Sequence, residues 1–378
     1  MDLPAALHSA SVRAGLCALG IAAVSPFAEV RRAMAERVRE GLQGRPGFTY
    51  RDPAVATDVR ASLPWAESLV VGAWGYLPAA GSPGAPRPGT GRVARFATAD
   101  HYALLRAGLE VVAGVLRGAG RRAEVLCDDS RLVDRAAAVR AGLGWWGRST
   151  MVLVPGHGPW VLLGSVATDA RLGEGTPLGR DCGSCTACLP ACPTGALVAP
   201  GVLDARRCLA ALAQSPGAIP REHRQAMGDR LYGCDACLEA CPPGRRRLRL
   251  ATGEGGRVDL AAVLAADDAA LRRRFGHFYL PGRRVRYLRR NALVALGNAG
   301  GQEAVSLAAA HLGHADPLLR AHAAWVLGAR RGPAAQAALR QAAGREGDPL
   351  VREEIALALR RGGADPADDG GRRGGSVP

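Results

Sequence analysis

The spacing of apolar and polar positions over the first 170 residues predicts alternating helices and strands. Apolar residues that recur every three or four positions indicate helices, and short continuous apolar runs bounded by turn residues indicate strands. We expect helices at 11–19, 27–42, 101–118 and 131–141, and strands at 68–76, from residue 125, at 150–154 and at 160–167. The pattern therefore predicts a mixed α/β domain.

Glycine and proline mark the breaks in this pattern. Residues 78–91 are rich in glycine, proline and alanine and predict a surface loop. The sequence Pro155-Gly-His-Gly158 predicts a hairpin turn that joins the strands on either side of it. Further along, the spacing at 204–212 predicts a helix that carries Cys208.

The last third of the chain repeats a short apolar motif. It occurs at 288–297, at 319–328 and from Val351 onward, with a period of 31 to 32 residues, and Asp-Pro pairs introduce the second and third copies. This pattern is typical of HEAT-type helical hairpins, which stack because a single pair cannot bury its apolar face. Residues 363–378, rich in glycine, aspartate and proline, are expected to form a disordered tail.

The composition of the chain indicates the cellular compartment of the protein and the class of partner that it binds. The longest apolar stretch near the start, 16–24, is too short to span a bilayer, and no clear leader-cleavage signal follows it, so we expect a cytoplasmic protein without a membrane anchor. The formal net charge is +15, and arginine carries all of the strong positive charge because the chain contains no lysine. Such an excess favours a polyanionic partner such as nucleic acid, although a solvated basic surface is the alternative.

Eight of the ten cysteines lie between residues 182 and 241. The first run reads C-x2-C-x2-C-x3-C-P, the spacing of bacterial two-cluster ferredoxins. The second run, from Cys234, lacks a leading cysteine, and Cys208 is placed to supply it. In that pattern three thiolates hold one [4Fe–4S] cluster and the fourth reaches the other cluster. We assign one cluster to Cys182, Cys185, Cys188 and Cys241, and the other to Cys192, Cys208, Cys234 and Cys237.

Two other uses of these cysteines are less consistent with the spacing. C-x2-C pairs also bind zinc, but a structural zinc takes four ligands and seldom a run of this form. Disulfides suit small secreted domains, whereas these thiols are crowded within a long chain. The remaining two, Cys17 and Cys127, lie in apolar stretches and are expected to be buried as small hydrophobic residues.

Two clusters close together pass electrons one at a time, and such a relay needs an acceptor. Some 180 residues precede the cysteine runs, and we expect this N-terminal part to hold the acceptor. Those residues include Cys127-Asp-Asp-Ser and Ala141-Gly-Leu-Gly-Trp145, and Leu231-Tyr-Gly-Cys234 opens the second cysteine run. Together with the cysteine runs and the helical repeats, these motifs resemble the epoxyqueuosine reductase family over nearly the whole chain. The resemblance implies a cobalamin-binding catalytic domain at 1–175, a two-cluster ferredoxin-like domain at 176–250, HEAT-like repeats at 251–362 and a tail at 363–378.

The resemblance also implies an enzyme activity. It is the reduction of epoxyqueuosine to queuosine at the wobble position of tRNA anticodons, with electrons passing through two [4Fe–4S] clusters to cobalamin and Asp128 as the proton donor. The protein would act as a monomer and would take electrons from an external donor such as a flavodoxin or ferredoxin. The residues expected to line the corrin are Arg95, Tyr102, Asp128, Ser149 and Ser215.

The local sequence gives Asp128 two possible roles. A carboxyl group that donates a proton near neutral pH needs a raised pKa, which burial beside apolar residues would supply. Alternatively, Asp128 or Asp129 caps the helix expected from Arg131. With the resemblance, we assign the proton to Asp128 and the cap to Asp129 or Ser130.

A basic stretch at 282–291 is the candidate tRNA contact. Tyr287 is expected to stack on a base, and Arg245–Arg247 to extend the patch. A solvated helix face is the alternative. The arginines expected to contact phosphates are Arg283, Arg284, Arg286, Arg289 and Arg290.

Two other functions remain open at this point. A reductive dehalogenase also combines cobalamin with two clusters, but usually has an export leader and lacks HEAT-like repeats. A ferredoxin fused to a helical scaffold would explain the cysteines and repeats without any catalysis, and would leave the first 180 residues without a role. Failure to bind a corrin would favour this second alternative.

Overall fold

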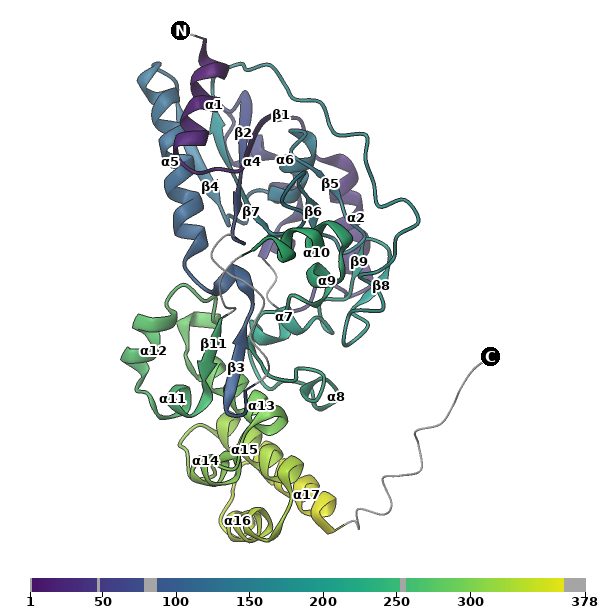
Figure 1. Cartoon of the computed structure of the whole chain (residues 1–378), viewed down its shortest axis with the longest axis vertical. Coiled ribbons are helices and arrows are strands. Elements are labelled where there is room, and N and C mark those ends of the chain that lie inside the picture. Colours follow the sequence, from purple (N-terminus) through teal and green to yellow (C-terminus); the bar gives the residue numbers. More distant parts are fainter. Residues whose placement is uncertain (1, 46–47, 78–86, 252–255, 364–378) are drawn as a thin grey trace. The chain divides into compact units, whose positions relative to one another are not determined.

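The computed structural model of the chain describes residues 2–45, 48–77, 87–251 and 256–363 (Figure 1). The chain forms two compact units. The first contains Met1–Gly84, Ala94–Leu212 and Gly233–Gly256, and the second contains Ala85–Val93, Ala213–Tyr232 and Arg257–Pro378. Most of the loop expected at 78–91 and nearly all of the expected tail lie outside the described residues. Within the described ranges, no helix has both the length and the apolar character needed to cross a membrane.

A four-stranded sheet forms the centre of the first unit. Its strands are β1 (Ala18–Ala23), β2 (Ser68–Gly75), β7 (Val161–Thr168) and β4 (Ala123–Cys127), in that spatial order. Every neighbouring pair is antiparallel, with Val70 opposite Val166 on β2 and β7. Because β2 and β7 are central, both of their faces are covered, and both read as nearly continuous apolar runs.

Helices cover both faces of this sheet (Figure 1). On one face α1 (Leu3–Arg13) and α5 (His101–Gly118) pack with Leu109 and Val112 against Val70 and Val166. On the other face α6 (Asp134–Arg140) buries Ala137 among side chains that include Leu69, which alternates with Val70 along β2. The alternation of side chains along each strand therefore divides the core into two layers.

Shorter elements complete the first unit. Some of them lie between the strands of the sheet along the chain, and others lie within the cysteine region, which follows β7. Their bounds are α2 Ala28–Arg39, η1 Phe48–Arg51, α3 Pro53–Ala56, α4 Val59–Ser62, η2 Arg95–Ala97, β5 Trp145–Trp146, β6 Val152–Leu153, β8 Leu197–Ala199, β9 Val202–Leu203, α7 Leu209–Ala213, α9 Ala236–Ala240 and α10 Pro242–Arg249.

The first expected helix is displaced. It was expected at 11–19, but α1 begins at Leu3 after the Asp2 cap and ends at Arg13. Gly15 adopts a left-handed conformation with φ +77°, which ends the helix, as glycine commonly does at this position. The apolar run from Ala18 is then free to pair with β2 as a strand.

The turn expected at 155–158 is present, but it does not join two paired strands. The Val154 N–H donates to the Gly158 carbonyl, as in a hairpin. However, β6, which precedes the turn, pairs with β5, whereas β7, which follows the turn, pairs with β2 and β4. Two expected helices also start later than predicted: α7 begins one residue after Cys208, and α6 begins at Asp134.

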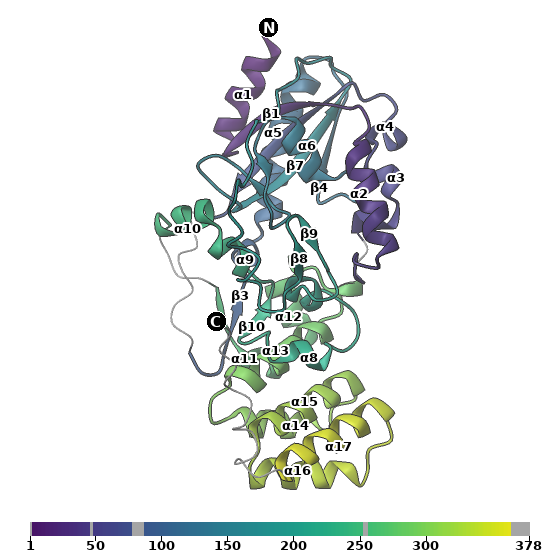
Figure 2. The same cartoon turned by 90° about the vertical axis from the view of Figure 1, so that its right-hand side faces the viewer.

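The second unit combines a small sheet with helices (Figure 2). Its strands β10, β3 and β11 adjoin in that order, and helices α13 to α17 contain the repeated motif. The bounds are β3 Thr90–Val93, α8 Arg221–Arg224, β10 Arg230–Tyr232, β11 Arg257–Asp259, α11 Leu260–Ala265, α12 Asp268–Phe275, η3 Pro281–Arg283, α13 Arg286–Ala299, α14 Ala304–His311, α15 Pro317–Arg330, α16 Pro333–Ala343 and α17 Pro349–Gly363.

The repeated motif forms α13, α15 and α17, which contact one another in succession. The Asp316 carboxylate accepts a hydrogen bond from the Leu318 N–H at 2.9 Å, and Asp348 does the same for Leu350. Each Asp-Pro pair thus starts a helix, with aspartate as the cap and proline in the first turn.

The glycine at the end of the motif lets successive helices approach closely. A Cβ atom on Gly297 would lie 2.4 Å from the Trp325 ring, and one on Gly328 would lie 2.7 Å from Cβ of Ala358. Both distances are shorter than any normal carbon–carbon contact. The repeat therefore needs glycine at these positions for packing.

We expect opposite effects from one substitution at two helical glycines. Gly114 lies in the exposed part of α5 with no atom near its missing Cβ, so Gly114→Ala should raise the free energy of unfolding by about 0.5–1 kcal/mol. Gly297→Ala should instead lower it by about 1–3 kcal/mol, because the methyl group meets Trp325. Urea denaturation of both variants checks this, and a stabilised Gly297→Ala protein would contradict it.

Candidate functional site

The eight clustered thiols form two groups of four. Burial raises the pKa of Cys241, and the nearby thiols of Cys182, Cys188 and Cys185 raise it further. Burial likewise raises the pKa of Cys208, which lies near the thiols of Cys234 and Cys192. Cys237 interacts most strongly with Cys234, Cys208 and Cys192, and more weakly with Cys188. These neighbours are compatible with the two ligand sets assigned from the spacing, which stay predictions.

Local turns hold the first run in place. The Cys185 N–H donates to the Cys182 carbonyl at 3.0 Å, and Gly183 between them has φ +50°. Burial disfavours the Cys192 thiolate, but hydrogen bonds from the backbone amides of Thr194 and Leu197 lower its pKa overall. This thiol is therefore already surrounded by donors that stabilise a sulfur anion, which is the form that binds iron.

A zinc ion and an iron–sulfur cluster place different demands on cysteine thiols. In the described part of the chain, no three histidine, cysteine or acidic side chains come close enough to share one metal ion. A tetrahedral zinc site draws four sulfurs around one atom, whereas a cubane places four iron atoms between its thiolates and spreads them farther apart. The two cysteine runs and Cys208 supply the eight thiolates that two [4Fe–4S] clusters take.

Arg95 fixes the second cysteine run to the rest of the unit. Its guanidinium pairs with Asp235 at 3.1 Å and with Glu239 at 2.6 Å, and its backbone N–H also donates to Asp235. Only 1% of Arg95 is exposed, and the guanidinium lies over the Trp160 ring. Arg95 was expected to line a corrin, but the structure places it inside the protein, where it joins η2 to α9.

Asp128 and Asp129 have opposite surroundings. Asp128 follows β4 with φ +53° and is exposed, yet partial desolvation by neighbouring protein atoms raises its pKa, and the Asp129 charge adds to this. Asp129 accepts hydrogen bonds from the Arg131 guanidinium, at 2.7 Å, and from the Arg131 N–H, and these bonds lower its pKa. The charged, paired residue is Asp129, and the one that favours the protonated form is Asp128.

Neither aspartate caps α6. That helix has Val133 at its cap position, without a side-chain hydrogen bond, and Ser130 also lies outside it. Asp129 instead closes the turn that precedes the helix. The capping role expected for Asp129 or Ser130 is therefore wrong, because the helix starts three residues later than the sequence pattern indicated.

Tyr102 and Asp134 belong to the same group of side chains as Asp128. Burial raises the pKa of Tyr102, and the charges of Asp128 and Asp134 raise it further. Burial also raises the pKa of Asp134 well above its usual range, with Asp128 as the next cause. Sequence reasoning missed Asp134, since an acidic residue at a helix start is ordinarily explained by the helix dipole.

The group has one unsatisfied acceptor. Oδ1 of Asp134 is buried and has no hydrogen-bond partner within the described residues. Buried polar atoms are nearly always paired, so this atom fits a bound molecule with hydrogen-bond donors. The carboxamide side chains around a corrin are donors of that kind, and Tyr102, half-buried, and Asp128, exposed, remain accessible nearby. These residues are compatible with a cobalamin site.

The two expected serines differ in their surroundings. Ser149 is buried in the first unit, close to the turn after β5. Ser215 belongs to the second unit, where its carbonyl accepts a hydrogen bond from the Arg290 guanidinium at 2.7 Å. Their contacts with a corrin stay predictions.

The basic stretch 282–291 is only partly available to RNA. Arg283 and Arg284 are exposed, whereas Arg286 pairs with Asp316 at 3.2 Å and Arg289 with Asp268 at 2.6 Å. Arg290 is 0% exposed, and Tyr287 is also buried. The expected contacts of Arg290 with phosphates and of Tyr287 with a base do not agree with this burial.

Arg290 instead organises the segment before α8. Its guanidinium donates to the carbonyls of Ala213, Ser215 and Gly217, and burial lowers its pKa to about 9. Asn291 adds a bond to the Ala213 carbonyl. The arginine of the first repeat is therefore a structural residue that ties residues 213–217 to α13.

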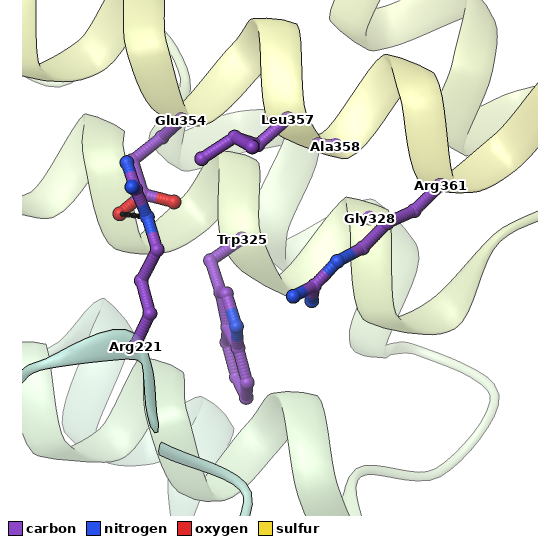
Figure 3. A pocket seen from close by; sticks show the side chains of 7 residues that line it. All are labelled: Arg221, Trp325, Gly328, Glu354, Leu357, Ala358 and Arg361. Carbon is purple, nitrogen blue, oxygen red and sulfur yellow. Dashed lines mark hydrogen bonds and ion pairs between the residues drawn. The ribbon is translucent and has the colours of Figure 1, made fainter. Parts of the chain in front are cut away.

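A second buried arginine, Arg224, contacts Glu354 and Trp325, two of the residues that line the small pocket shown in Figure 3. Arg224 pairs with Glu354 at 2.7 Å, and Arg221 approaches the same carboxylate at 3.0 Å, beside the Trp325 ring. The cavity holds about 10 Å³, which is room for at most one water molecule. It is a packing defect between repeats and not a ligand site.

Comparison with known proteins agrees with this architecture. The family of 4Fe-4S double cluster binding domains matches residues 181–244, and the HEAT repeat family matches residues 284–360. The matches describe an iron–sulfur protein that ends in helical repeats.

Relatives over nearly the full length are more specific. The chain is 30% identical to the epoxyqueuosine reductase of Bacillus cereus, over 91% of this chain and 93% of the relative, and 32% identical to that of Bacillus subtilis, over 84% and 86%. A crystal structure of a selenomethionine-labelled epoxyqueuosine reductase superposes with a TM-score of 0.87, at 30% identity, over 96% of this chain and 99% of that one. The chain belongs to the epoxyqueuosine reductase family.

Two further structures show relatives in informative states. One is an epoxyqueuosine reductase with an epoxyqueuosine-modified tRNA-Tyr stem loop, at 28% identity and a TM-score of 0.85, covering 96% of this chain and 99% of that chain. The other is the Bacillus subtilis enzyme with an aspartate catalytic loop swung out of its active site, at 29% identity and a TM-score of 0.85, covering 95% and 99%. The resemblance expected from the sequence, the fold class and the assignment as an oxidoreductase that acts on tRNA are confirmed.

The buried Arg95 pair should matter far more for stability than an exposed pair. Arg95→Met removes the buried guanidinium from both the Asp235 and the Glu239 carboxylates, so the free energy of unfolding should fall by about 3–5 kcal/mol. Arg117→Met removes the exposed pair with Glu110 and should cost under about 1 kcal/mol. Anaerobic urea denaturation measures both variants, and equal losses would show that Arg95 does not hold α9 in place.

Proposed function

We propose that this chain reduces epoxyqueuosine to queuosine at the wobble position of tRNA anticodons, with two [4Fe–4S] clusters, cobalamin and the Asp128 carboxyl. One observation carries the proposal. A single compact unit contains both the two groups of four thiols and an accessible aspartate with a raised pKa. Electron delivery and proton delivery are the two requirements of this reaction, because removing the epoxide oxygen as water consumes two electrons and two protons.

The chain divides these tasks between separate residues. One set, Cys182, Cys185, Cys188 and Cys241, holds one cluster, and the other, Cys192, Cys208, Cys234 and Cys237, holds the second. When bound, the clusters carry electrons one at a time. When bound, cobalamin supplies a strongly reducing cobalt centre.

Asp128 supplies a proton to the departing oxygen. Its pKa is raised because protein atoms desolvate the carboxyl group and because Asp129 beside it is ionised. Arg131 keeps Asp129 ionised, so the charge that favours a protonated Asp128 is itself held in place. The aspartate catalytic loop of the Bacillus subtilis relative supports an acid of this type.

The side chains around Asp128 are proposed to hold the corrin. Tyr102 offers a half-buried phenol, and Asp134 offers the unsatisfied Oδ1 atom for a carboxamide donor. Arg95 acts indirectly, since it fixes α9 from within the core. Ser149 and Ser215 remain candidate contacts.

The second unit is proposed to contribute to tRNA binding. Arg283 and Arg284 are exposed, and they lie on η3 and just after it, ahead of α13. Guanidinium groups of this kind bind phosphates without reading sequence. A wobble base in a single-stranded loop can be turned out of its stack to reach a buried site, which fits an enzyme that acts on that base. The relative bound to a modified stem loop supports this use of the fold.

The proposed cofactors can be counted. Anaerobic purification followed by supply of cobalamin should give about eight irons and one cobalt per chain, with corrin absorption bands in the visible spectrum. Eight irons without cobalt uptake would contradict the cobalamin site and would favour a ferredoxin-like electron carrier or scaffold.

The role of Asp128 can be separated from that of its neighbour. In single turnover on epoxyqueuosine-containing tRNA, Asp128→Asn should lower the rate by about 10²–10⁴-fold, the usual contribution of a positioned acid. The rate of the unmodified protein should fall as the pH rises through the raised pKa of Asp128, because the proton-bearing form is lost.

Asp129→Asn serves as the matched control. Removing this charge takes away one cause of the raised Asp128 pKa, so the falling limb of the pH profile should move to lower pH while the rate at low pH is largely kept. A pH profile unchanged by both substitutions would show that neither carboxyl group supplies the proton.

A further inference from the structure

The last turns of α10 carry a concentration of exposed arginines. Arg245, Arg246 and Arg249 are exposed, and Leu250 directly after the helix is 67% exposed. Within residues 2–45, 48–77, 87–251 and 256–363, no carboxylate lies at salt-bridge distance from any of these three guanidinium groups. We refer to these three arginines together with Leu250 as the α10 face.

The α10 face follows Cys241 closely in the chain, and Cys241 is assigned to the ligand set that also contains Cys182, Cys185 and Cys188. Cys241 is the cap residue of α10, and its carbonyl accepts a hydrogen bond from the Arg245 N–H at 2.7 Å. The helix also contacts α9, which precedes Cys241 in the chain (Figures 1 and 2). The first arginine of the face therefore lies one helical turn from a thiol that we assign to a cluster.

The packing of α10 holds this face rigidly. The Trp160 indole N–H, buried in the core, donates to the Gly244 carbonyl at 2.8 Å. A Cβ atom on Gly244 would lie 2.2 Å from the Leu238 carbonyl oxygen, so only glycine permits this approach of α10 to α9. A surface fixed in this way can present its charges to a partner without first being ordered.

Two other arginines of the same unit are neutralised by carboxylates. Arg95 forms ion pairs with Asp235 and Glu239, the acidic residues of the neighbouring α9 segment. Arg131 forms ion pairs with Asp129 and Glu124. Among the described residues, the two carboxylates that precede α10, Asp235 and Glu239, are thus already engaged. Within the part of the chain that the structure describes, the three arginines that follow Cys241 thus form a local cluster of positive charge, in a chain whose overall net charge is +15.

We propose that the α10 face is the docking surface for an acidic one-electron carrier protein, of which flavodoxin is the test case. This inference rests on the proposed function, because it concerns how electrons enter the cluster to which Cys241 is assigned. Each encounter oxidises the carrier by one electron and reduces one [4Fe–4S] cluster from the 2+ to the 1+ state, with no bond made or broken. Redox partners meet through small, transient interfaces, and opposite charge steers their encounter.

The position of the face favours a redox protein over RNA. Phosphate binding requires only positive charge, whereas this surface adds an exposed leucine and direct attachment to a cluster thiol. A ring of charge around an apolar contact is the composition expected of a protein interface. RNA binding is the competing outcome that the experiment must detect.

The test is the affinity of oxidised flavodoxin for the cluster-loaded protein at low salt, measured by calorimetric titration. The variant Arg245→Glu/Arg246→Glu/Arg249→Glu should bind at least about tenfold more weakly. The control Arg13→Glu/Arg39→Glu/Arg121→Glu changes three exposed arginines elsewhere in the unit, alters the net charge by the same amount, and should bind nearly as tightly as the unmodified protein. Equal weakening in both variants would overturn the proposal.

Electron transfer gives a second readout. Reduction of the clusters by flavodoxin hydroquinone should slow at least about tenfold in the α10 variant, while reduction by a small viologen dye stays unchanged. A variant that keeps its flavodoxin affinity but loses tRNA stem-loop binding would identify the α10 face as an RNA surface and overturn the proposal.

Controls separate this inference from the function on which it rests. Iron content and the viologen reaction report whether the clusters are present, so failure of the proposed function appears there in the unmodified protein. If the glutamate variant does not fold, Arg245→Gln/Arg246→Gln/Arg249→Gln tests the same face. Flavodoxin affinity that is unchanged in the folded glutamine variant would overturn the docking surface while leaving the clusters intact.

Discussion

The buried pairing of Arg95 with Asp235 and Glu239 is the interaction on which the redox part of this protein depends. The second cysteine run occupies a short helix and its flanking turns, which have little core of their own. Arg95 lies six residues before α5, a helix that packs directly on the sheet, so the pair connects the thiols to the largest core of the unit. Because a buried charge without its partner is costly, α9 has one strongly preferred position.

An arginine–carboxylate pair also shapes the surroundings of the proposed acid, Asp128. Two adjacent aspartates would ordinarily share similar surroundings, yet Arg131 engages one and leaves the other partly desolvated. The ionised neighbour then disfavours a second negative charge. The proposed proton donor and a neighbour whose charge raises its pKa thus follow each other in sequence, and the Arg131 guanidinium pairs with only the second of them.

Local patterns made some features predictable from the sequence and left others hidden. The cysteine spacing and the Asp-Pro starts of α15 and α17 depend on short-range geometry, so their interpretation did not require the fold. The burial of Arg290 did require it, because the carbonyls that it binds lie more than seventy residues earlier. The first strand was mistaken for a helix because the left-handed Gly15 divides an apolar stretch that looks continuous. Asp134 escaped notice because nothing in its neighbourhood along the chain shows that one of its oxygens is buried.

The path of the chain through the two units limits how this protein can be divided. The small sheet of the second unit takes β3 and β10 from inside the sequence of the first, and only β11 precedes the repeats directly. A fragment cut at residue 257 would leave β11 without either of the other strands and Arg290 without its three carbonyl acceptors. The helical repeats are therefore not a detachable module, and exchanging them by simple end-to-end fusion would require changes inside the sequence of the first unit as well.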